Sequence, residues 1–483
     1  MITVRLSEEM YTYDIHSLVK AFYQDEDVHM ILIEETGENF SGFEVCYSEG
    51  FLEVKIVADG NVKKSLKAVT GGMERPQVKN VLKQQLYLLL SEETGKELPW
   101  GTLTGIRPTK LPMGMLKEGK NDDEISVYMK NTYFASKEKT MLSIDIAKRE
   151  QKILAGLHGA DGFSLYIGIP FCPTTCLYCS FTSYPIAKWK NRVEEYLAAL
   201  KREIDLTAGI YRDQMLDTVY IGGGTPTTLT PEQLEELIIY VKERFDFKTV
   251  QEFTVEAGRP DSITREKLDT LFRCGVNRIS INPQTMNEQT LRIIGRQHTV
   301  EQVRKAFLLA REAGFTNINM DLILGLPGED LAMLTYTLSE IERLDPDSIT
   351  VHSMAIKRAA GMAQFLSEHE EIKSVNTPQM MEAAREAAER MGMKPYYLYR
   401  QKNMAGNFEN VGYAREGKYG IYNILIMEEI QSIAALGAGS ISKAVLPDGR
   451  IERTDNVKDV TLFIEENDKL LAKKKSFYDK LKR

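Results

Sequence analysis

The sequence predicts an α/β fold: a partial (β/α)6 barrel that follows an N-terminal α+β domain and precedes a small C-terminal α/β extension. From Gly162 onward, short β-rich runs alternate with amphipathic helical runs, which is typical of a parallel sheet with right-handed crossovers. The chain has 483 residues, enough for about two or three domains. About six strand–helix units indicate an open barrel, whose chemistry is expected at the C-terminal ends of its strands.

Residues 1–158 are predicted to form the N-terminal domain, to which the sequence assigns no role. The elements expected there are strands at Ile2–Leu6 and Met30–Glu34, a hairpin at Ser41–Val57 and a helix at Pro76–Leu90. The helix is predicted from apolar residues that recur three or four positions apart.

Residues 159–377 are predicted to form the barrel. The expected strands are Phe163–Ile169, Thr218–Ile221, Glu252–Glu256, Arg278–Asn282, Ile318–Leu324 and Ser348–His352. The expected helices between them are Val193–Leu206, Pro231–Arg244, Thr264–Cys274, Val300–Ala313 and Leu331–Arg343.

Residues 378–483 are predicted to form the C-terminal extension. A helix opens it, a tyrosine-rich segment follows at Tyr396–Tyr399, and a glycine-rich stretch lies at Leu436–Ser440.

Composition and charge narrow the class of protein. The formal net charge is −8, which argues against a large nucleic-acid interface because phosphate binding needs concentrated positive charge. No apolar run approaches the roughly 20 residues of a membrane span, and the N-terminal stretch is unlike a secretory signal. We therefore expect a cytoplasmic protein without membrane or nucleic-acid partners.

Three of the five cysteines, Cys172, Cys176 and Cys179, fall within eight residues with the spacing C-x3-C-x2-C, directly after a predicted strand. Three thiolates can bind three irons of a 4Fe–4S cluster and leave the fourth iron open for a ligand. A structural zinc site would need a fourth ligand, and the nearest histidine, His158, precedes the strand. Inert core cysteines are disfavoured because Pro173–Thr175 do not form a core pattern.

This cysteine pattern, with an aromatic residue before the last cysteine, resembles the signature of radical S-adenosylmethionine (SAM) enzymes. Later motifs resemble the family of oxygen-independent coproporphyrinogen III dehydrogenase: GGGTP at 222–226, GRQH at 295–298 and NxDLIxGLPG at 319–328. The resemblance covers residues 163–330 well and extends in patches to 441. It implies a radical SAM barrel that holds a 4Fe–4S cluster and one or two SAM molecules.

The resemblance also implies which residues bind the cofactor. Gly223, Gly224 and Thr225 would bind its methionine part, and Arg296 its carboxylate. Asp321 would accept from the ribose hydroxyls and Tyr166 would pack on the sulfonium, while Glu256 and Gln284 would make further cofactor contacts. Each of these residues has a plainer alternative role, such as a tight turn, a solvated carboxylate, a surface arginine or a helix cap.

Several positions depart from the family pattern. The usual histidine two residues before Pro170 is Gly168, and Asn282-Pro283 replaces a glycine and an aliphatic residue. The family's C-terminal Cys-Arg-His-Asn segment is absent. The long N-terminal region resembles the HemZ-type branch of the family.

The resemblance implies oxidative decarboxylation of coproporphyrinogen III propionates to vinyl groups, which gives protoporphyrinogen IX in heme biosynthesis. The electron donor would be a flavodoxin or a ferredoxin. Side chains expected to receive the anionic tetrapyrrole are Arg259, Lys357, Arg358, Arg400 and Tyr396–Tyr399.

Three alternatives remain open. The first is a heme-binding chaperone of the same family, with His352 as a candidate heme ligand. The second is a radical tetrapyrrole methyltransferase or heme-degrading enzyme. The third is an RNA-modifying radical enzyme, against which the acidic net charge counts.

Overall fold

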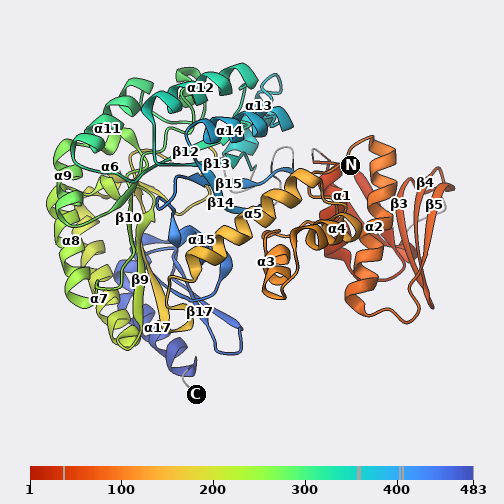
Figure 1. Cartoon of the computed structure of the whole chain (residues 1–483), viewed down its shortest axis with the longest axis horizontal. Helices are drawn as coiled ribbons and strands as arrows, with labels where there is room; N and C mark the ends of the chain where they lie inside the picture. Colours follow the sequence, from red (N-terminus) through yellow and green to blue (C-terminus); the bar gives the residue numbers. More distant parts are fainter. Residues whose placement is uncertain (25, 36–38, 356–360, 402–403, 405–406, 482–483) are drawn as a thin grey trace. The chain divides into compact units, whose positions relative to one another are not determined.

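The computed structural model divides the chain into two compact units. Unit 1 comprises residues 1–148 and 398–409, and unit 2 comprises 149–397 and 410–483 (Figure 1). The structure describes all residues except 25, 36–38, 356–360, 402–403, 405–406 and 482–483. Within the described residues, no helix combines the length and the apolar character that crossing a membrane requires. The expected boundaries at 158 and 377 stay predictions.

Unit 1 contains a five-stranded mixed sheet in the order β2-β1-β3-β4-β5. Its strands are β1 (Ile2–Leu6), β2 (Val28–Leu32), β3 (Gly42–Ser48), β4 (Phe51–Ala58) and β5 (Asn61–Val69). Its helices are α1 (Thr12–Phe22), α2 (Arg75–Thr94), α3 (Lys110–Lys117), α4 (Asp122–Tyr133) and the first part of α5 (Lys137–Leu154). Side chains of α1, α2 and the sheet share one apolar core.

Local sequence explains why α2 begins and ends where it does. Glu74 and Gln77 form a capping box, Pro76 stands in the first turn, and Gly95 ends the helix at φ 65°. Proline is tolerated in a first turn because its missing N–H has no partner there, and glycine adopts the left-handed end without strain.

Unit 2 contains an eleven-stranded sheet in the order β14-β15-β13-β12-β11-β10-β9-β6-β16-β17-β18. The parallel strands are β6 (Gly162–Ile169), β9 (Met215–Gly223), β10 (Glu252–Glu256), β11 (Arg278–Ser280), β12 (Ile318–Leu324), β13 (Ser348–Ser353) and β16 (Ser432–Leu436). The remaining strands of the sheet are β14 (Lys394–Tyr399), β15 (Asn410–Ala414), β17 (Ile441–Val445) and β18 (Ile451–Asp455). The short strands β7 (Phe171–Cys172) and β8 (Tyr184–Pro185) pair separately.

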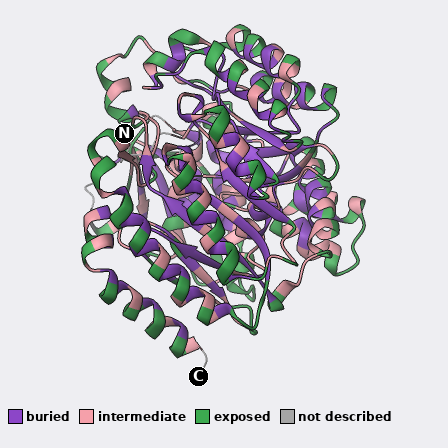
Figure 2. Ribbon diagram, turned by 90° about the vertical axis from the view of Figure 1, so that its left-hand side faces the viewer, coloured by how far each residue is buried: buried purple, intermediate pink, exposed green. Residues whose placement is uncertain are grey.

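Helices cover the outer face of the parallel strands in an arc (Figure 1). The crossover helices are α7 (Val193–Tyr211), α8 (Pro231–Arg244), α9 (Arg265–Arg273), α11 (Val300–Glu312) and α12 (Leu331–Leu344). The others are α6 (Ile186–Trp189), α10 (Glu288–Ile293), α13 (Met362–Glu368), α14 (Pro378–Arg390), α15 (Ile421–Glu428), α16 (Val460–Glu465) and α17 (Asn467–Leu481). The strands are buried and the helices expose one side (Figure 2). The predicted α/β class with an open, mostly parallel barrel is confirmed.

Candidate functional site

The three clustered cysteines lie on the loop that follows β6. Cys172, Cys176 and Cys179 are half-buried cysteines that take part in no disulfide. Leu177 donates its backbone N–H to Ile294 O (3.1 Å), so the GRQH segment at 295–298 lies beside this loop. The thiols therefore lie at the C-terminal end of β6, as the sequence analysis predicted.

The surroundings of these thiols suit thiolates that bind iron. Thr225 Oγ1 lies 3.5 Å from Cys172 Sγ and donates to it, and Arg259 Nη1 lies 3.6 Å from Cys176 Sγ. The pKa of Cys172 is raised to about 11, mainly by burial and to a smaller extent by the other two cysteines, against Thr225 and Arg259, which lower it. Hydrogen bonds to sulfur tune iron–sulfur clusters, so the donor set fits such a group.

The described side chains contain no group of three histidine, cysteine or acidic residues placed to hold a single metal ion. Three cysteines that each bind a different iron of one cluster need not converge on one point. The assignment of Cys172, Cys176 and Cys179 as cluster ligands stays a prediction that this donor set fits.

Arg259 anchors the cysteine loop, a role that the sequence did not suggest. Its guanidinium donates to Thr174 O (3.2 Å) and to Thr174 Oγ1 (3.1 Å), and it forms a two-pronged ion pair with Asp261. Arg259 is buried at 3% exposure. The sequence analysis predicted that Arg259 receives the substrate, but in this structure it binds Thr174, two residues before Cys176.

Arg296 has a similar position on the other side of the loop. Its Nε donates to the Tyr178 hydroxyl (3.1 Å), and its Nη1 donates to Asn282 O. A Cβ on Gly295 would lie 3.4 Å from Thr175 O. Arg296 thus joins the cysteine loop to the end of β11, and its predicted contact with the cofactor carboxylate stays a prediction.

The glycine segment after β9 packs closely on the same loop. A Cβ on Gly224 would lie 2.6 Å from Phe171 O, so a side chain there would displace the cysteine loop. The backbone N–H of Gly224 donates to Ile169 O (2.8 Å), and that of Thr225 to Phe171 O (2.7 Å). These two amides, predicted to face the cofactor, bind the stem of the cysteine loop in this structure.

Glu256 ends β10 and faces this segment. Its carboxylate accepts from the Tyr220 hydroxyl and from Gly223 N (3.3 Å). The pKa of Glu256 is raised to about 7, mainly by desolvation and also by the nearby Asp321, against hydrogen bonds from Tyr220 and Gly223 that lower it. The predicted cofactor residues Glu256 and Gly223 are therefore brought together.

Three tyrosine rings stack beside Glu256. Tyr166, the predicted sulfonium contact on β6, has its ring centroid 6.2 Å from that of Tyr220 and 6.1 Å from that of Tyr422, and Tyr220 and Tyr422 lie 4.5 Å apart. The sequence did not single out Tyr220 and Tyr422. Tyr220 stands two residues before the Gly222–Gly224 run, and this position could have identified it as a candidate site residue.

Gln284 has an unusual backbone conformation at the end of β11. Its φ is 67°, which is rare outside glycine, and its backbone bridges β12 through Asp321 O and Ile323 N. Its side-chain Oε1 is buried without a hydrogen-bond partner. A buried acceptor without a donor is costly unless a ligand supplies one, and this orphaned atom fits the predicted cofactor contact.

Asp321 lies between Gln284 and His352. Burial alone would raise its pKa, but His352, at 3.7 Å, and the Asn319 amide hold it below the usual value. Asn282 Oδ1 accepts from Asp321 N (3.3 Å). His352, proposed as a heme ligand in the chaperone alternative, thus lies beside the predicted ribose acceptor.

For two of the remaining substrate candidates, Arg400 and Tyr396, the structure shows contacts within their own surroundings. Arg400 belongs to unit 1, where it donates to Leu103 O and Asn407 O. Tyr396 is fully buried and packs on Tyr397 and Tyr419. Lys357 and Arg358 lie outside the described residues.

Comparison with known proteins agrees with this geometry. The profile of the Radical SAM superfamily matches residues 166–341. The chain is 44% identical over 388 residues to the oxygen-independent coproporphyrinogen-III oxidase-like protein HemZ of Bacillus subtilis, which covers 79% of this chain and 77% of that protein.

Shorter matches fall on related proteins. The heme chaperone HemW of Bacillus subtilis is 40% identical over 195 residues, which is 40% of this chain and about half (51%) of that protein. The structure of the coproporphyrinogen III oxidase HemN from Escherichia coli, a radical SAM enzyme, superposes with a TM-score of 0.51 at 23% identity, covering 66% of this chain and 72% of that chain. This last likeness supports the fold.

Radical SAM proteins use a 4Fe–4S cluster and S-adenosylmethionine. The extent of the HemZ match settles the family. The chain belongs to the radical SAM superfamily and, within it, to the family of oxygen-independent coproporphyrinogen-III oxidase-like proteins of the HemZ type.

Proposed function

We propose that this protein is a radical SAM oxidoreductase that decarboxylates the propionate groups of coproporphyrinogen III without oxygen and so forms protoporphyrinogen IX. The observation that carries the proposal is the match to HemZ, named as a coproporphyrinogen-III oxidase-like protein, along most of both chains. The barrel mouth supports it, because it combines thiols that suit a cluster with an unsatisfied acceptor at Gln284 that suits the cofactor.

The protein's own residues would hold the cluster and SAM in position and shield them. When bound, the cluster and SAM supply a radical that removes a hydrogen atom from a propionate β-carbon. Carbon dioxide then leaves with loss of one electron, a vinyl group remains, and the electron passes to an acceptor outside the chain. Cys172, Cys176 and Cys179 would hold the cluster, Glu256 and Gln284 would orient SAM, and Asp321 would accept from its ribose.

The test is an anaerobic assay of full-length protein reconstituted with iron and sulfide. Coproporphyrinogen III, SAM and a reductant such as a flavodoxin or a ferredoxin are added, and products are followed by mass spectrometry. We expect loss of two carboxyl groups per substrate and formation of deoxyadenosine. Cys176→Ala is expected to abolish both, because it removes one of three thiolates that hold the cluster.

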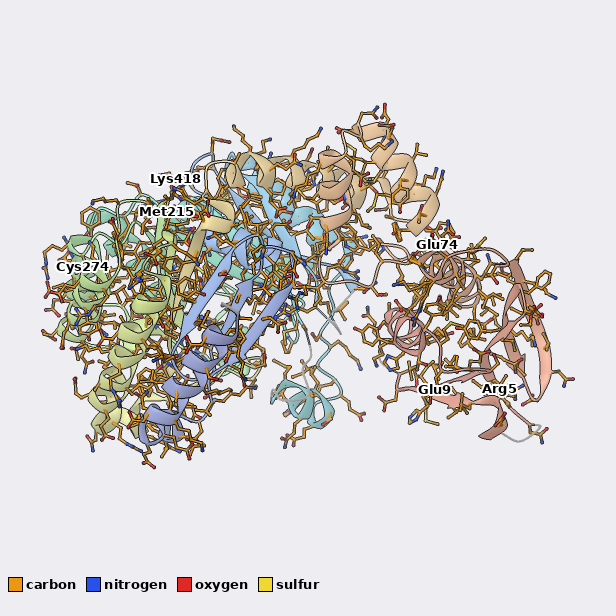
Figure 3. The ribbon with its side chains drawn as sticks, turned by 90° about the horizontal axis from the view of Figure 1, so that it is seen from below. Arg5, Glu9, Glu74, Met215, Cys274 and Lys418 are labelled. Atoms are coloured by element: carbon orange, nitrogen blue, oxygen red, sulfur yellow. The ribbon has the colours of Figure 1, made fainter. Side chains whose placement is uncertain are left out.

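Cys274→Ala is the matched control. Cys274 follows the last residue of α9 at the edge of unit 2 in Figure 3 and is a buried free thiol. It is expected to keep wild-type turnover. Equal activity of Cys176→Ala and wild type would contradict the cluster assignment, and deoxyadenosine without decarboxylation would contradict the substrate.

A heme chaperone is the second candidate, and one comparison favours it. The chain is 40% identical over 195 residues to the heme chaperone HemW of Bacillus subtilis, against 34% over 192 residues to the coproporphyrinogen III oxidase of Salmonella typhimurium. Under this alternative the purified protein binds heme, which visible absorption spectroscopy would detect, and leaves coproporphyrinogen III unchanged.

A further inference from the structure

A loop of the C-terminal region lies against the strand that leads into the cysteine loop. We call it the bracing loop, residues Gly437–Ser440, which follow β16. A Cβ on Gly437 would lie 2.5 Å from Gly168 O, so this approach requires glycine, which also adopts φ 93° there. The Tyr196 hydroxyl donates to Gly168 O (2.6 Å) and accepts from Ala438 N (3.1 Å). One hydroxyl thus joins the bracing loop to β6, just before Cys172.

The cysteine loop has two stems: β6 leads into it, and residues 182–184, the far stem, lead out of it. The far stem contacts the same C-terminal region. A Cβ on Gly439 would lie 2.5 Å from Thr182 Oγ1. The Tyr184 hydroxyl donates to Lys458 O (3.2 Å), and Tyr184 N donates to Pro170 O (2.8 Å), which closes the two stems on each other. Both stems of the cysteine loop therefore depend on where this C-terminal segment lies.

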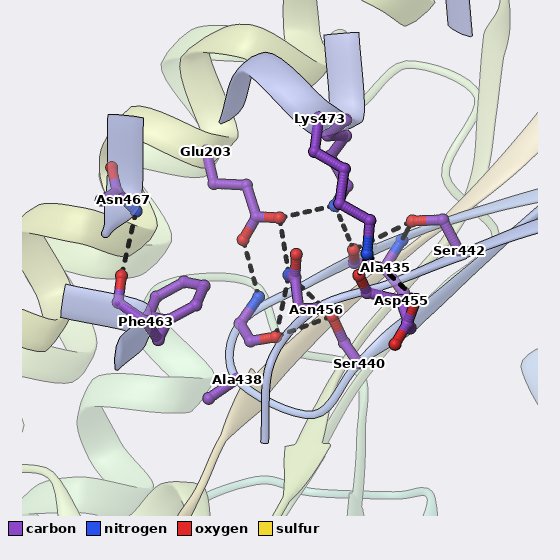
Figure 4. Close-up of polar contacts among 12 residues, drawn as sticks. Glu203, Ala435, Ala438, Ser440, Ser442, Asp455, Asn456, Phe463, Asn467 and Lys473 are labelled. Atoms are coloured by element: carbon purple, nitrogen blue, oxygen red, sulfur yellow. Dashed lines mark hydrogen bonds and ion pairs between the residues drawn. The ribbon is translucent and has the colours of Figure 1, made fainter. Parts of the chain in front are cut away.

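A buried charged network fixes the bracing loop. Glu203 on α7 accepts from Gly437 N (2.8 Å) and from Asn456 Nδ2 (2.7 Å), and the Asn456 amide also donates to Gly437 O (3.0 Å). Lys474 on α17 forms an ion pair with Glu203 and donates to Ala435 O (2.6 Å). Glu203 and Asn456 point toward one another at this loop (Figure 4).

Neither charge has access to solvent. Glu203 is 2% exposed and Lys474 is 4% exposed. A buried charge is tolerated only when it is paired and hydrogen-bonded, so the network defines one position for the loop. Groups that orient metal ligands from outside the ligand set affect metal affinity by about 10- to 100-fold.

We propose that Glu203, Asn456 and Lys474 are positioning residues for the cluster. Through the bracing loop they hold both stems of the cysteine loop, so that helix α17, near the C-terminal end of the chain, sets the geometry of a cluster on Cys172, Cys176 and Cys179. The inference rests on the proposed function, because it presupposes that these thiols bind a cluster.

The test compares Lys474→Met with Lys473→Met in full-length protein reconstituted anaerobically. Lys473 is the neighbouring residue on α17, but its side chain is 54% exposed and pairs with Asp455 on the surface. Lys474→Met is expected to lose iron to a chelator about tenfold faster than wild type, and the EPR spectrum of its reduced cluster with SAM is expected to change shape. Lys473→Met is expected to match wild type in both.

A second variant separates positioning from folding. Lys474→Met leaves Glu203 buried without its partner and can destabilise the fold. The double variant Glu203→Leu/Lys474→Met removes both charges, so we expect it to unfold at a higher temperature than Lys474→Met. Because Gly437 N and Asn456 Nδ2 lose their acceptor, we expect it still to lose iron faster than wild type. A cluster in the double variant with wild-type stability and EPR spectrum would overturn the positioning role and leave the proposed function standing. Failure of the wild-type protein to assemble any cluster would overturn both.

Discussion

At the scale of single residues, Glu256 gives the site a dependence on pH. Its usual pKa is 4.5, and desolvation raises it to about 7 in the folded protein. The folded state therefore binds more protons than the unfolded chain between these values, and the contribution of Glu256 to stability falls as pH rises through this window. At about pH 7 the carboxylate is only half ionised, and it becomes a full acceptor about one to two pH units higher.

We predict that SAM binding follows this ionisation. If the Glu256 carboxylate accepts from the cofactor, binding tightens as pH rises through about 7 and levels off above about pH 8. At about pH 6 only a tenth of the protein is ionised at this position, so the affinity should be about tenfold below its plateau. Glu256→Gln should remove this step. Equilibrium dialysis of SAM against cluster-loaded protein measures both profiles, and parallel profiles for the two proteins would contradict the assignment.

Arg296 and Gln284 illustrate what single residues reveal before a structure is known. The GRQH motif predicts a cofactor contact for Arg296, but the contacts of Arg296 with Tyr178 and Asn282 depend on loops that meet only in the fold. The left-handed backbone of Gln284 could not be predicted either, because non-glycine residues rarely adopt it and the sequence carries no signal for it.

At the scale of elements, the bounds of β1, β10, β12 and α8 agree with the sequence prediction, because turn residues flank these runs. Strand β11 ends at Ser280 rather than Asn282, where Pro283 lacks the N–H that a longer ladder needs. Strand β2 lies two residues earlier than expected. The seventh parallel strand, β16, was not predicted, because it joins β6 from more than 250 residues away in the sequence.

Helix α2 carries a buried lysine, and its replacement should stabilise unit 1. Desolvation lowers the pKa of Lys83 from 10.5 to about 8, against a partial rise from Asp14, and its ammonium donates to Thr104 Oγ1 (3.0 Å). Below about pH 8 the buried charge costs about 3 kcal/mol, of which the hydrogen bond offsets about 1 kcal/mol. Lys83→Met should therefore raise the free energy of unfolding by about 2 kcal/mol at neutral pH.

The pH dependence checks the cause of this effect. Between about pH 8 and pH 10.5 the unfolded chain keeps the proton that the folded protein has lost, so the wild-type protein gains stability as pH rises. The advantage of Lys83→Met should shrink over this range. Hydrogen exchange of α2 peptides at several pH values measures it, and a constant advantage would show that packing rather than charge is responsible.

At the scale of the whole molecule, unit 1 is built from two segments that lie far apart in the sequence. The segment Leu398–Glu409 comes from the C-terminal half of the chain but belongs to unit 1. Glu409 is 1% exposed there, accepts from Trp100 Nε1 (2.7 Å) and pairs with Lys139 (2.9 Å). A fragment that ended at Lys148 would leave both partners buried without their acceptor.

We therefore predict that Glu409→Leu destabilises unit 1 although the substitution lies far along the chain. Removing one member of a buried ion pair costs up to about 3–5 kcal/mol. Of its described ion pairs, Lys139 would keep only that with the exposed Glu138, 2.8 Å away, and Trp100 Nε1 would lose its acceptor. Hydrogen exchange should rise in peptides around Trp100 and Lys139. Glu416→Leu is the control, because Glu416 is exposed and its ion pair with Lys152 lies at the surface. If Glu409→Leu left those peptides protected and opened the strands of unit 2 instead, the segment would have to be reassigned to the barrel.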